Sequence, residues 1–198
     1  WSDGPHKVGE PDYWLWSVVV HPDGAIYGVG YGDLKNRPVT ARLYRSDDGI
    51  NYETIVPTMS ATPTSSETAL LFRNDGSAVA LVRLEGARSR IGTARGDYTQ
   101  WTFKDIDQAT GGPELIELPD GTLVVGTRLR SGKVRTSLCW VDPEAGRMAE
   151  LLRLPSRGDS SYPGLAWHDG VLWMSYYSTH EGKTSIYLAK VRVEPAAK

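Results

Sequence analysis

The stretch VVVHPDGAIYGVGY, residues 18–31, places an Asp-Gly pair between two apolar runs, and the same arrangement occurs three more times. The other copies are ALLFRNDGSAVALVR at 69–83, ELIELPDGTLVVGTR at 114–128 and GLAWHDGVLWMSYY at 164–177. Asp-Gly supplies the positive φ angles of a two-residue hairpin turn, so each copy predicts two antiparallel strands joined at a tip. Successive tips are 52, 45 and 49 residues apart, a period typical of β-propeller blades.

A third strand-like run follows every hairpin, and a fourth run follows in three of the repeats. The fourth runs are YETIV (52–56), QWTFKDI (100–106) and RMAELLRL (147–154). Local propensity alone would allow RMAELLRL to be helical, but its place in the repeat predicts a strand. We therefore predict an all-β chain that forms one β-propeller unit over residues 1–198, with four blades of antiparallel strands. The repeats span about 13–56, 65–106, 111–154 and 160–194.

The last repeat ends after its third strand, because only VEPAAK (193–198) remains. An unpaired edge strand is open to pairing with another strand, and residues 1–12, with their Gly and Pro, are a poor candidate to cover it. Two alternatives follow. The chain is either a closed four-bladed propeller, or the C-terminal part of a larger propeller that a missing N-terminal segment completes. We favour the second alternative.

Composition excludes several classes of function. The net charge of -2 and the pI of about 6.1 give no basic surface for nucleic acid. No apolar run approaches the ~20 residues of a membrane span. Cys139 is the single cysteine, so neither an intrachain disulfide nor a thiolate metal site is expected, and no metal or cofactor is predicted. The seven Trp and ten Tyr, against two Phe, suit sugar-binding surfaces as well as propeller cores.

Strand direction brings the start of each hairpin and the end of its second strand to one face, opposite the Asp-Gly tips. The second strands all reach this face seven residues after the turn glycine, at Tyr31, Arg83, Arg128 and Tyr177. The segments before the first strands contribute Asp12, Glu67, the 111–113 turn and Tyr162. Two guanidinium groups suit the binding of a carboxylate. The alternative is that both arginines form structural ion pairs with neighbouring acids.

Three segments resemble the sialidase (neuraminidase) superfamily, glycoside hydrolases built as six-bladed propellers. SSETALLFRNDGSAVALVR (65–83) and SSYPGLAWHDGVLWMSYY (160–177) are similar to segments near its active site. YRSDDGINY (44–52) resembles its Asp-box (BNR) turn, one residue short and with Tyr in place of Trp. The resemblance covers essentially the whole chain, in the register of the last four blades.

The resemblance implies roles for individual residues. Tyr162 would be the nucleophile and Glu67 the base that activates it. Arg83 and Arg128 would hold the substrate carboxylate, and Glu181 would orient an arginine outside this chain. Trp16, just before the first strand, could stack on a sugar. The superfamily's first arginine and its acid/base aspartate have no convincing match here.

The sequence therefore predicts an exo-glycosidase that acts on a sialoside or another acidic glycan through a tyrosine nucleophile, with retention. The resemblance also implies a secreted or periplasmic location, although the chain shows no targeting signal. Two alternatives stay open. One is a related glycosidase for a different acidic sugar, and the other is a non-catalytic propeller that binds glycans or proteins.

Overall fold

The computed structural model describes residues 7–32, 40–60, 62 and 64–193, and every regular element in them is a β-strand. Blade 1 contains β1 (Tyr13–Val20), β2 (Ile26–Gly32), β3 (Ala41–Ser46) and β4 (Glu53–Val56). Blade 2 contains β5 (Ser65–Phe72), β6 (Ala78–Leu84), β7 (Arg90–Ala94) and β8 (Thr102–Asp105). Blade 3 contains β9 (Thr110–Glu117), β10 (Leu123–Leu129), β11 (Arg135–Asp142) and β12 (Arg147–Arg153). Blade 4 contains β13 (Ser160–His168), β14 (Val171–Ser178) and β15 (Ser185–Arg192).

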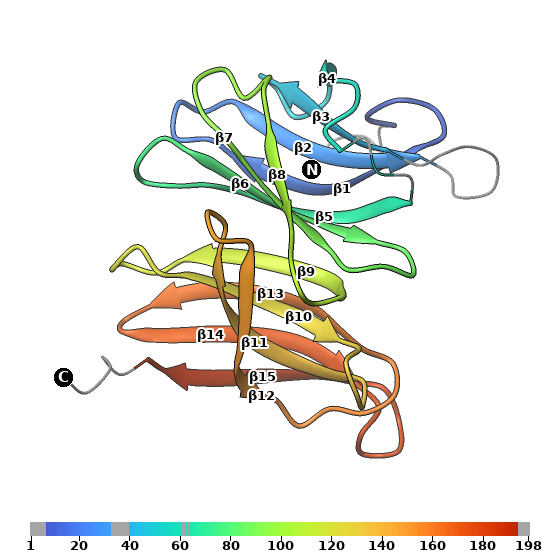
Figure 1. Cartoon of the computed structure of the whole chain (residues 1–198), viewed down its shortest axis with the longest axis vertical. Helices are drawn as coiled ribbons and strands as arrows, with labels where there is room; N and C mark the ends of the chain where they lie inside the picture. The colour runs from blue at the N-terminus through green and yellow to red at the C-terminus, as the bar shows by residue number, and fades with distance from the viewer. Residues whose placement is uncertain (1–6, 33–39, 61, 63, 194–198) are drawn as a thin grey trace, which may run out of the picture.

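Each blade is one antiparallel sheet whose strands pair in chain order (Figure 1). The prediction of an all-β propeller with four antiparallel blades is confirmed, including the strand at 147–153. The fourth sheet has three strands in the described part of the chain. Neighbouring blades pack through their first strands, so the starts of β5, β9 and β13 lie next to one another.

The first three Asp-Gly tips are three-residue loops, which corrects the expected two-residue turns. At the first tip the Gly24 N–H donates to the His21 carbonyl at 2.9 Å, and the His21 N–H donates to the Ala25 carbonyl at 2.8 Å. This is a type I turn closed by a glycine at φ 94°, which a side chain would strain. The Asp23 carboxylate accepts the Ala25 N–H at 2.9 Å and so holds the loop. The second and third tips repeat both features at Asp75 and Asp120.

The fourth tip is the two-residue turn that the sequence predicts. Asp169 and Gly170 both have positive φ, 49° and 73°, and His168 pairs directly with Val171. Two of the three longer loops have proline before the Asp-Gly pair, and the second tip has Asn74 there. Pro22 and Pro119 favour the second position of a type I turn, whereas His168 is a strand residue.

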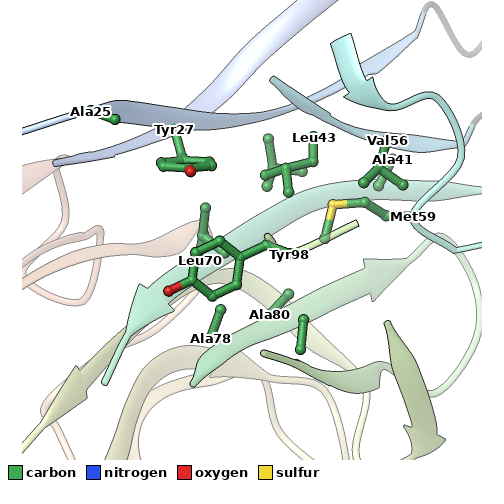
Figure 2. Close-up of a cluster of buried hydrophobic side chains, with 12 residues drawn as sticks. Ala25, Tyr27, Ala41, Leu43, Val56, Met59, Leu70, Ala78, Ala80 and Tyr98 are labelled. Carbon is green, nitrogen blue, oxygen red and sulfur yellow. The ribbon is translucent and has the colours of Figure 1, made fainter. Parts of the chain in front are cut away.

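The hydrophobic core lies between successive blades. Tyr27 and Leu43 of blade 1 face Leu70 and Ala80 of blade 2 (Figure 2). A second cluster joins blades 2 and 3, and a third joins blades 3 and 4. The faces of blades 1 and 4 that no other described blade covers are apolar as well. Val18 and Val20 of β1 are exposed there, and so are Ile186 and Leu188 of β15. No further sheet of the described part covers these two apolar rows.

Candidate functional site

The first strand of every blade carries a β-bulge near its start, on the face predicted to hold a site. The bulged residues are Trp16 in β1, Ser66 and Glu67 in β5, Gly112 and Pro113 in β9, and Tyr162 and Pro163 in β13. A bulge breaks the alternation of side chains along a strand and redirects the extra residue. Repetition of the same irregularity therefore directs side chains from all four blades toward one place.

Tyr162 and Glu67 form the central contact of this cluster. The Tyr162 hydroxyl donates to Oε1 of Glu67 at 2.7 Å, and the Glu67 side chain is buried while the Tyr162 ring is 43% exposed. Burial first, and then the hydrogen bond to Glu67, raise the pKa of the Tyr162 phenol above its usual range. The phenol therefore rests protonated, as a donor to an acidic partner.

The backbone that presents Tyr162 is strained. Ser161 and Tyr162 have φ angles of 141° and 44°, in a region that residues with side chains rarely adopt. Such conformations cost ~1–3 kcal/mol each and persist where the surroundings hold them. The Ser161 hydroxyl donates to the Gly111 carbonyl at 2.9 Å, and a Cβ on Gly112 would lie 2.4 Å from the Tyr162 ring. The two adjoining bulges thus fit together only because residue 112 is glycine.

Glu67 is fully occupied by partners on three blades. Its Oε2 accepts the Gly112 N–H at 2.7 Å and also a hydrogen bond from the Arg83 guanidinium. Arg83 in turn donates to Glu85 at 2.9 Å. Arg83 is thus held between two carboxylates of the protein, which is the ion-pair alternative that the sequence left open.

Arg128 lies beside Tyr162 but is also engaged by protein groups. Its guanidinium carbon lies 5.7 Å from the centre of the Tyr162 ring, and its Nε donates to the Ser160 carbonyl. Its terminal nitrogen contacts Asp159 and the Tyr177 hydroxyl, each at 3.2 Å. Binding of a substrate carboxylate by Arg83 or Arg128 accordingly stays a prediction.

Aromatic rings wall the exposed side of the cluster. The Trp16 ring lies 5.4 Å from the Tyr162 ring, and the Tyr177 ring stacks with Tyr162 at 5.8 Å. Tyr31 lies 6.1 Å from Trp16. Flat apolar surfaces next to hydrogen-bonding groups suit the faces and hydroxyls of a sugar ring.

Glu114 is a site residue that the sequence analysis missed. It lines a small cavity of about 180 Å³ together with Trp16, Pro113, Tyr162 and Pro163. Burial raises the pKa of the Glu114 carboxyl to about 7, so between about pH 4.5 and 7 this acid stays largely protonated while an exposed glutamate is ionised. The Gly-Gly-Pro run before Glu114 was a signal for it, because Gly and Pro inside a strand mark a bulge.

The structure brings together five of the six predicted site residues, namely Trp16, Glu67, Arg83, Arg128 and Tyr162. Glu181 lies apart from them and accepts a hydrogen bond from the Tyr187 hydroxyl at 2.9 Å. In the described part of the chain, no cluster of three or more His, Cys, Asp or Glu residues could hold a metal ion. The same residues include no helix long and apolar enough to cross a bilayer.

Comparison with known proteins identifies the fold and leaves the family open. No family model and no curated protein sequence matches this chain. Among solved structures, a protein of unknown function from Dyadobacter fermentans aligns with TM-score 0.76 and 16% identity over 90% of this chain and 53% of its own. An arabinanase of Bacillus subtilis aligns with TM-score 0.60 and 14% identity, over 91% of this chain and 73% of its own.

A xyloglucan-locus protein of Bacteroides ovatus, from glycoside hydrolase family 43, aligns with TM-score 0.62 and 15% identity, over 92% of this chain and 39% of its own. The chain therefore spans about half or less of these first two neighbours, the Dyadobacter and Bacteroides proteins. At such identities the likeness concerns the fold, which is that of propeller glycoside hydrolases.

These neighbours correct the sialidase assignment. They include family-43 glycoside hydrolases, five-bladed propellers, and they are not sialidases, so the assignment is wrong and its six-bladed ring is unsupported. The physical reason lies in the repeat. Asp-Gly hairpins, a polar residue at the start of the first strand and a long side chain at the end of the second belong to blade geometry in propellers of any size. The Ser46–Asp48 turn of the supposed Asp-box is likewise explained locally, because Asp48 accepts the Ile50 and Asn51 N–H groups at 2.8 and 2.7 Å.

Proposed function

We propose that this chain carries the catalytic face of a β-propeller glycoside hydrolase that cleaves an acidic glycan. One observation carries the proposal. A carboxyl group whose pKa burial raises to about 7, Glu114, lines the same cavity as a phenol, Tyr162, that is hydrogen-bonded to a paired carboxylate. Acid and base are separated by environment, which is the usual way in which one site holds both at neutral pH.

The proposed first step uses these groups as follows. Glu114 donates its proton to the leaving glycosidic oxygen, because it is the buried acid of the cavity. The Tyr162 oxygen bonds to the anomeric carbon as Glu67, 2.7 Å away, accepts the phenol proton. A neutral phenol also approaches a negatively charged sugar without the repulsion that a carboxylate nucleophile would meet.

The second step reverses the proton transfers. Glu114, now ionised, takes a proton from a water molecule that attacks the anomeric carbon from the side of the departed group. The bond to Tyr162 breaks, and Glu67 returns the proton to the phenol oxygen. Two inversions give net retention, and both carboxyl groups recover their starting protonation.

The aromatic wall supports a sugar as the substrate. Trp16 and Tyr177 flank the ring of Tyr162, so a sugar over the nucleophile would contact apolar faces. The fold likeness to an arabinanase and to family-43 hydrolases is consistent with this class of reaction.

The test is hydrolysis of a panel of uronic-acid oligosaccharides, monitored by the release of reducing sugar. Glu114→Gln and Tyr162→Phe are each expected to lower kcat by about a hundredfold or more, the usual contribution of such groups. Tyr187→Phe, the same change at a tyrosine stacked on Tyr176 in blade 4, is the control and should keep full turnover. Turnover that survives both site substitutions would overturn the proposal.

A second function, a non-catalytic glycan-binding propeller, is favoured by two observations. Arg83 and Arg128 are both engaged by protein acids, and the phenol pKa of Tyr162 is raised. This alternative expects glycan binding without hydrolysis. Isothermal titration with the same oligosaccharides distinguishes the two functions.

A further inference from the structure

A second and larger cavity is lined by Arg83, the partner of Glu67 in its ion pair. Its volume is about 440 Å³, within the range of small-molecule sites. The walls come from the loop after β6 in blade 2, the start of β9 and the end of β10 in blade 3. They contain three arginines and one acid, Arg83, Arg88, Arg130 and Glu85.

The charges of this cavity do not cancel. Glu85 is paired with Arg83, which also bonds Glu67, so these three groups are satisfied by one another. Arg88 and Arg130 are exposed, and no ion pair within the described residues involves either of them. Two guanidinium groups therefore face a cavity whose only acid is already engaged, and they give it a positive potential.

The walls are fixed by hydrogen bonds that do not involve the arginines. The Ser89 N–H donates to the Gln108 carbonyl at 2.9 Å, and the Ser89 hydroxyl lies 2.7 Å from that of Thr110. The Ser131 hydroxyl donates to Gln108 at 3.1 Å, next to Arg130. The loop that carries Arg88 and the strand end that carries Arg130 are thus tied to the same short segment. Such bracing fixes the two backbone positions from which the arginine side chains extend.

The cavity is connected to the proposed catalytic cluster through one strand. Thr110 of β9 lines the larger cavity, while Gly112 and Glu114 of the same strand line the smaller one. A strand rises ~3.3 Å per residue, so the residues of β9 that line the two cavities begin about 7 Å apart. The two cavities are thus neighbours along one strand.

We propose that the cavity lined by Arg88 and Arg130 is a subsite for the uronate carboxylate of an acidic glycan. The proposal rests on the proposed function in placing this unit next to the sugar that is cleaved. Arginine suits this anion, because its planar fork forms paired charge-assisted hydrogen bonds with a carboxylate. Long-range attraction would also make the affinity fall as salt increases.

The test is isothermal titration of the intact chain with trigalacturonate, with its fully methyl-esterified form and with inorganic phosphate. Arg88→Ala and Arg130→Ala are each expected to weaken trigalacturonate binding by about tenfold, the usual effect of losing a charged hydrogen bond. Arg147→Ala, which removes an exposed arginine from β12 of blade 3, is the control and should leave the affinity unchanged.

The ligand forms separate the sources of binding. The subsite is supported if trigalacturonate binds more tightly than its methyl ester and if this difference in affinity disappears in both variants. Equal affinity for the charged and esterified forms overturns it. Binding of phosphate without any binding of trigalacturonate overturns it as well. Titration does not depend on turnover, so a chain that binds the uronate selectively without cleaving it keeps the subsite and contradicts the hydrolase.

Discussion

The Tyr162 hydroxyl donates a hydrogen bond to Glu67 at 2.7 Å and so joins blade 4 to blade 2 across 95 residues of sequence. The other oxygen of Glu67 accepts the Gly112 N–H from blade 3. One carboxylate therefore ties together three sheets that share no backbone hydrogen bonds with one another. Loss of the Glu67 carboxylate should therefore destabilise the protein more than loss of any one of its hydrogen-bond donors.

Substitutions at the two ends of this bond should have unequal effects on stability. Glu67→Gln leaves the buried Arg83 with a single acid, and removing one member of a buried pair costs about 3 kcal/mol. Tyr162→Phe removes one hydrogen bond from a half-exposed ring and should cost about 1 kcal/mol. Urea unfolding of both variants measures the difference. Equal costs would mean that Glu67 is held chiefly by the tyrosine.

Gly112 should be far less replaceable than its neighbour Gly111. Gly112 has φ 54°, and a Cβ there would meet the Tyr162 ring at 2.4 Å. A Cβ on Gly111 would lie 3.5 Å from Arg128, an ordinary contact. Gly112→Ala should therefore lower the free energy of unfolding by about 2 kcal/mol and displace Tyr162, while Gly111→Ala should change it by less than about 1 kcal/mol. Thermal melts of the two variants compare them, and similar melting temperatures would contradict the strain at residue 112.

The fold could be predicted from sequence because its signals are local and repeated. Asp-Gly pairs and a period near fifty residues specify hairpins and blades without any knowledge of distant contacts. The type of turn is also local, but it depends on the residue before the pair. Pro22 and Pro119 favour the longer loop at the first and third tips, whereas the Asp-Gly pair alone does not distinguish the two kinds of turn.

The two kinds of tip lead to different expectations for replacing the turn aspartate with glycine. Asp169 lies in the left-handed region, so Asp169→Gly removes a strained side chain and should change stability by less than about 0.5 kcal/mol. Asp120 instead accepts the Thr122 N–H at 2.9 Å, so Asp120→Gly loses that bond and adds chain entropy, at a cost of about 1 kcal/mol. Urea midpoints decide between them, and an equal loss at both positions would contradict the turn assignment.

The site was only partly predictable, because its members come from four blades. Repeat register was enough to bring Glu67, Arg83 and Tyr162 to one face. It could not show that each lies beside a bulge, nor that Glu85 and Asp159 engage the arginines. Glu114 was missed because the bulge at Gly112 and Pro113 changes the alternation of the strand just before it. The family assignment failed for a related reason, since motifs set by blade geometry do not identify the chemistry at the site.

Cys139 should report global unfolding. The residue is fully buried in β11, and burial raises the pKa of its thiol to about 12, so the reactive thiolate is absent from the folded state at neutral pH. Labelling with iodoacetamide should be negligible in buffer and should rise with urea along the unfolding transition. Rapid labelling of the folded chain, with its far-ultraviolet circular dichroism unchanged, would contradict a closed core between blades 2 and 3.

Glu114 should make the stability of the protein depend on pH in a direction opposite to most glutamates. Its pKa is about 7 in the folded state, against an ordinary value of 4.5, because burial disfavours the charge. Between these values the folded state keeps a proton that the unfolded state has lost. The free energy of unfolding therefore falls as pH rises from about 4.5 to 7, by up to about 3 kcal/mol, and levels off above 7.

Urea unfolding at several pH values should show this slope in the native chain and in Glu144→Gln, an exposed control. The slope should be reduced in Glu114→Gln. If the native chain cleaves a glycan, kcat should also fall above pH 7 as the acid is lost. A slope unaltered in Glu114→Gln would show that this carboxyl is ionised at neutral pH and would remove it as the acid.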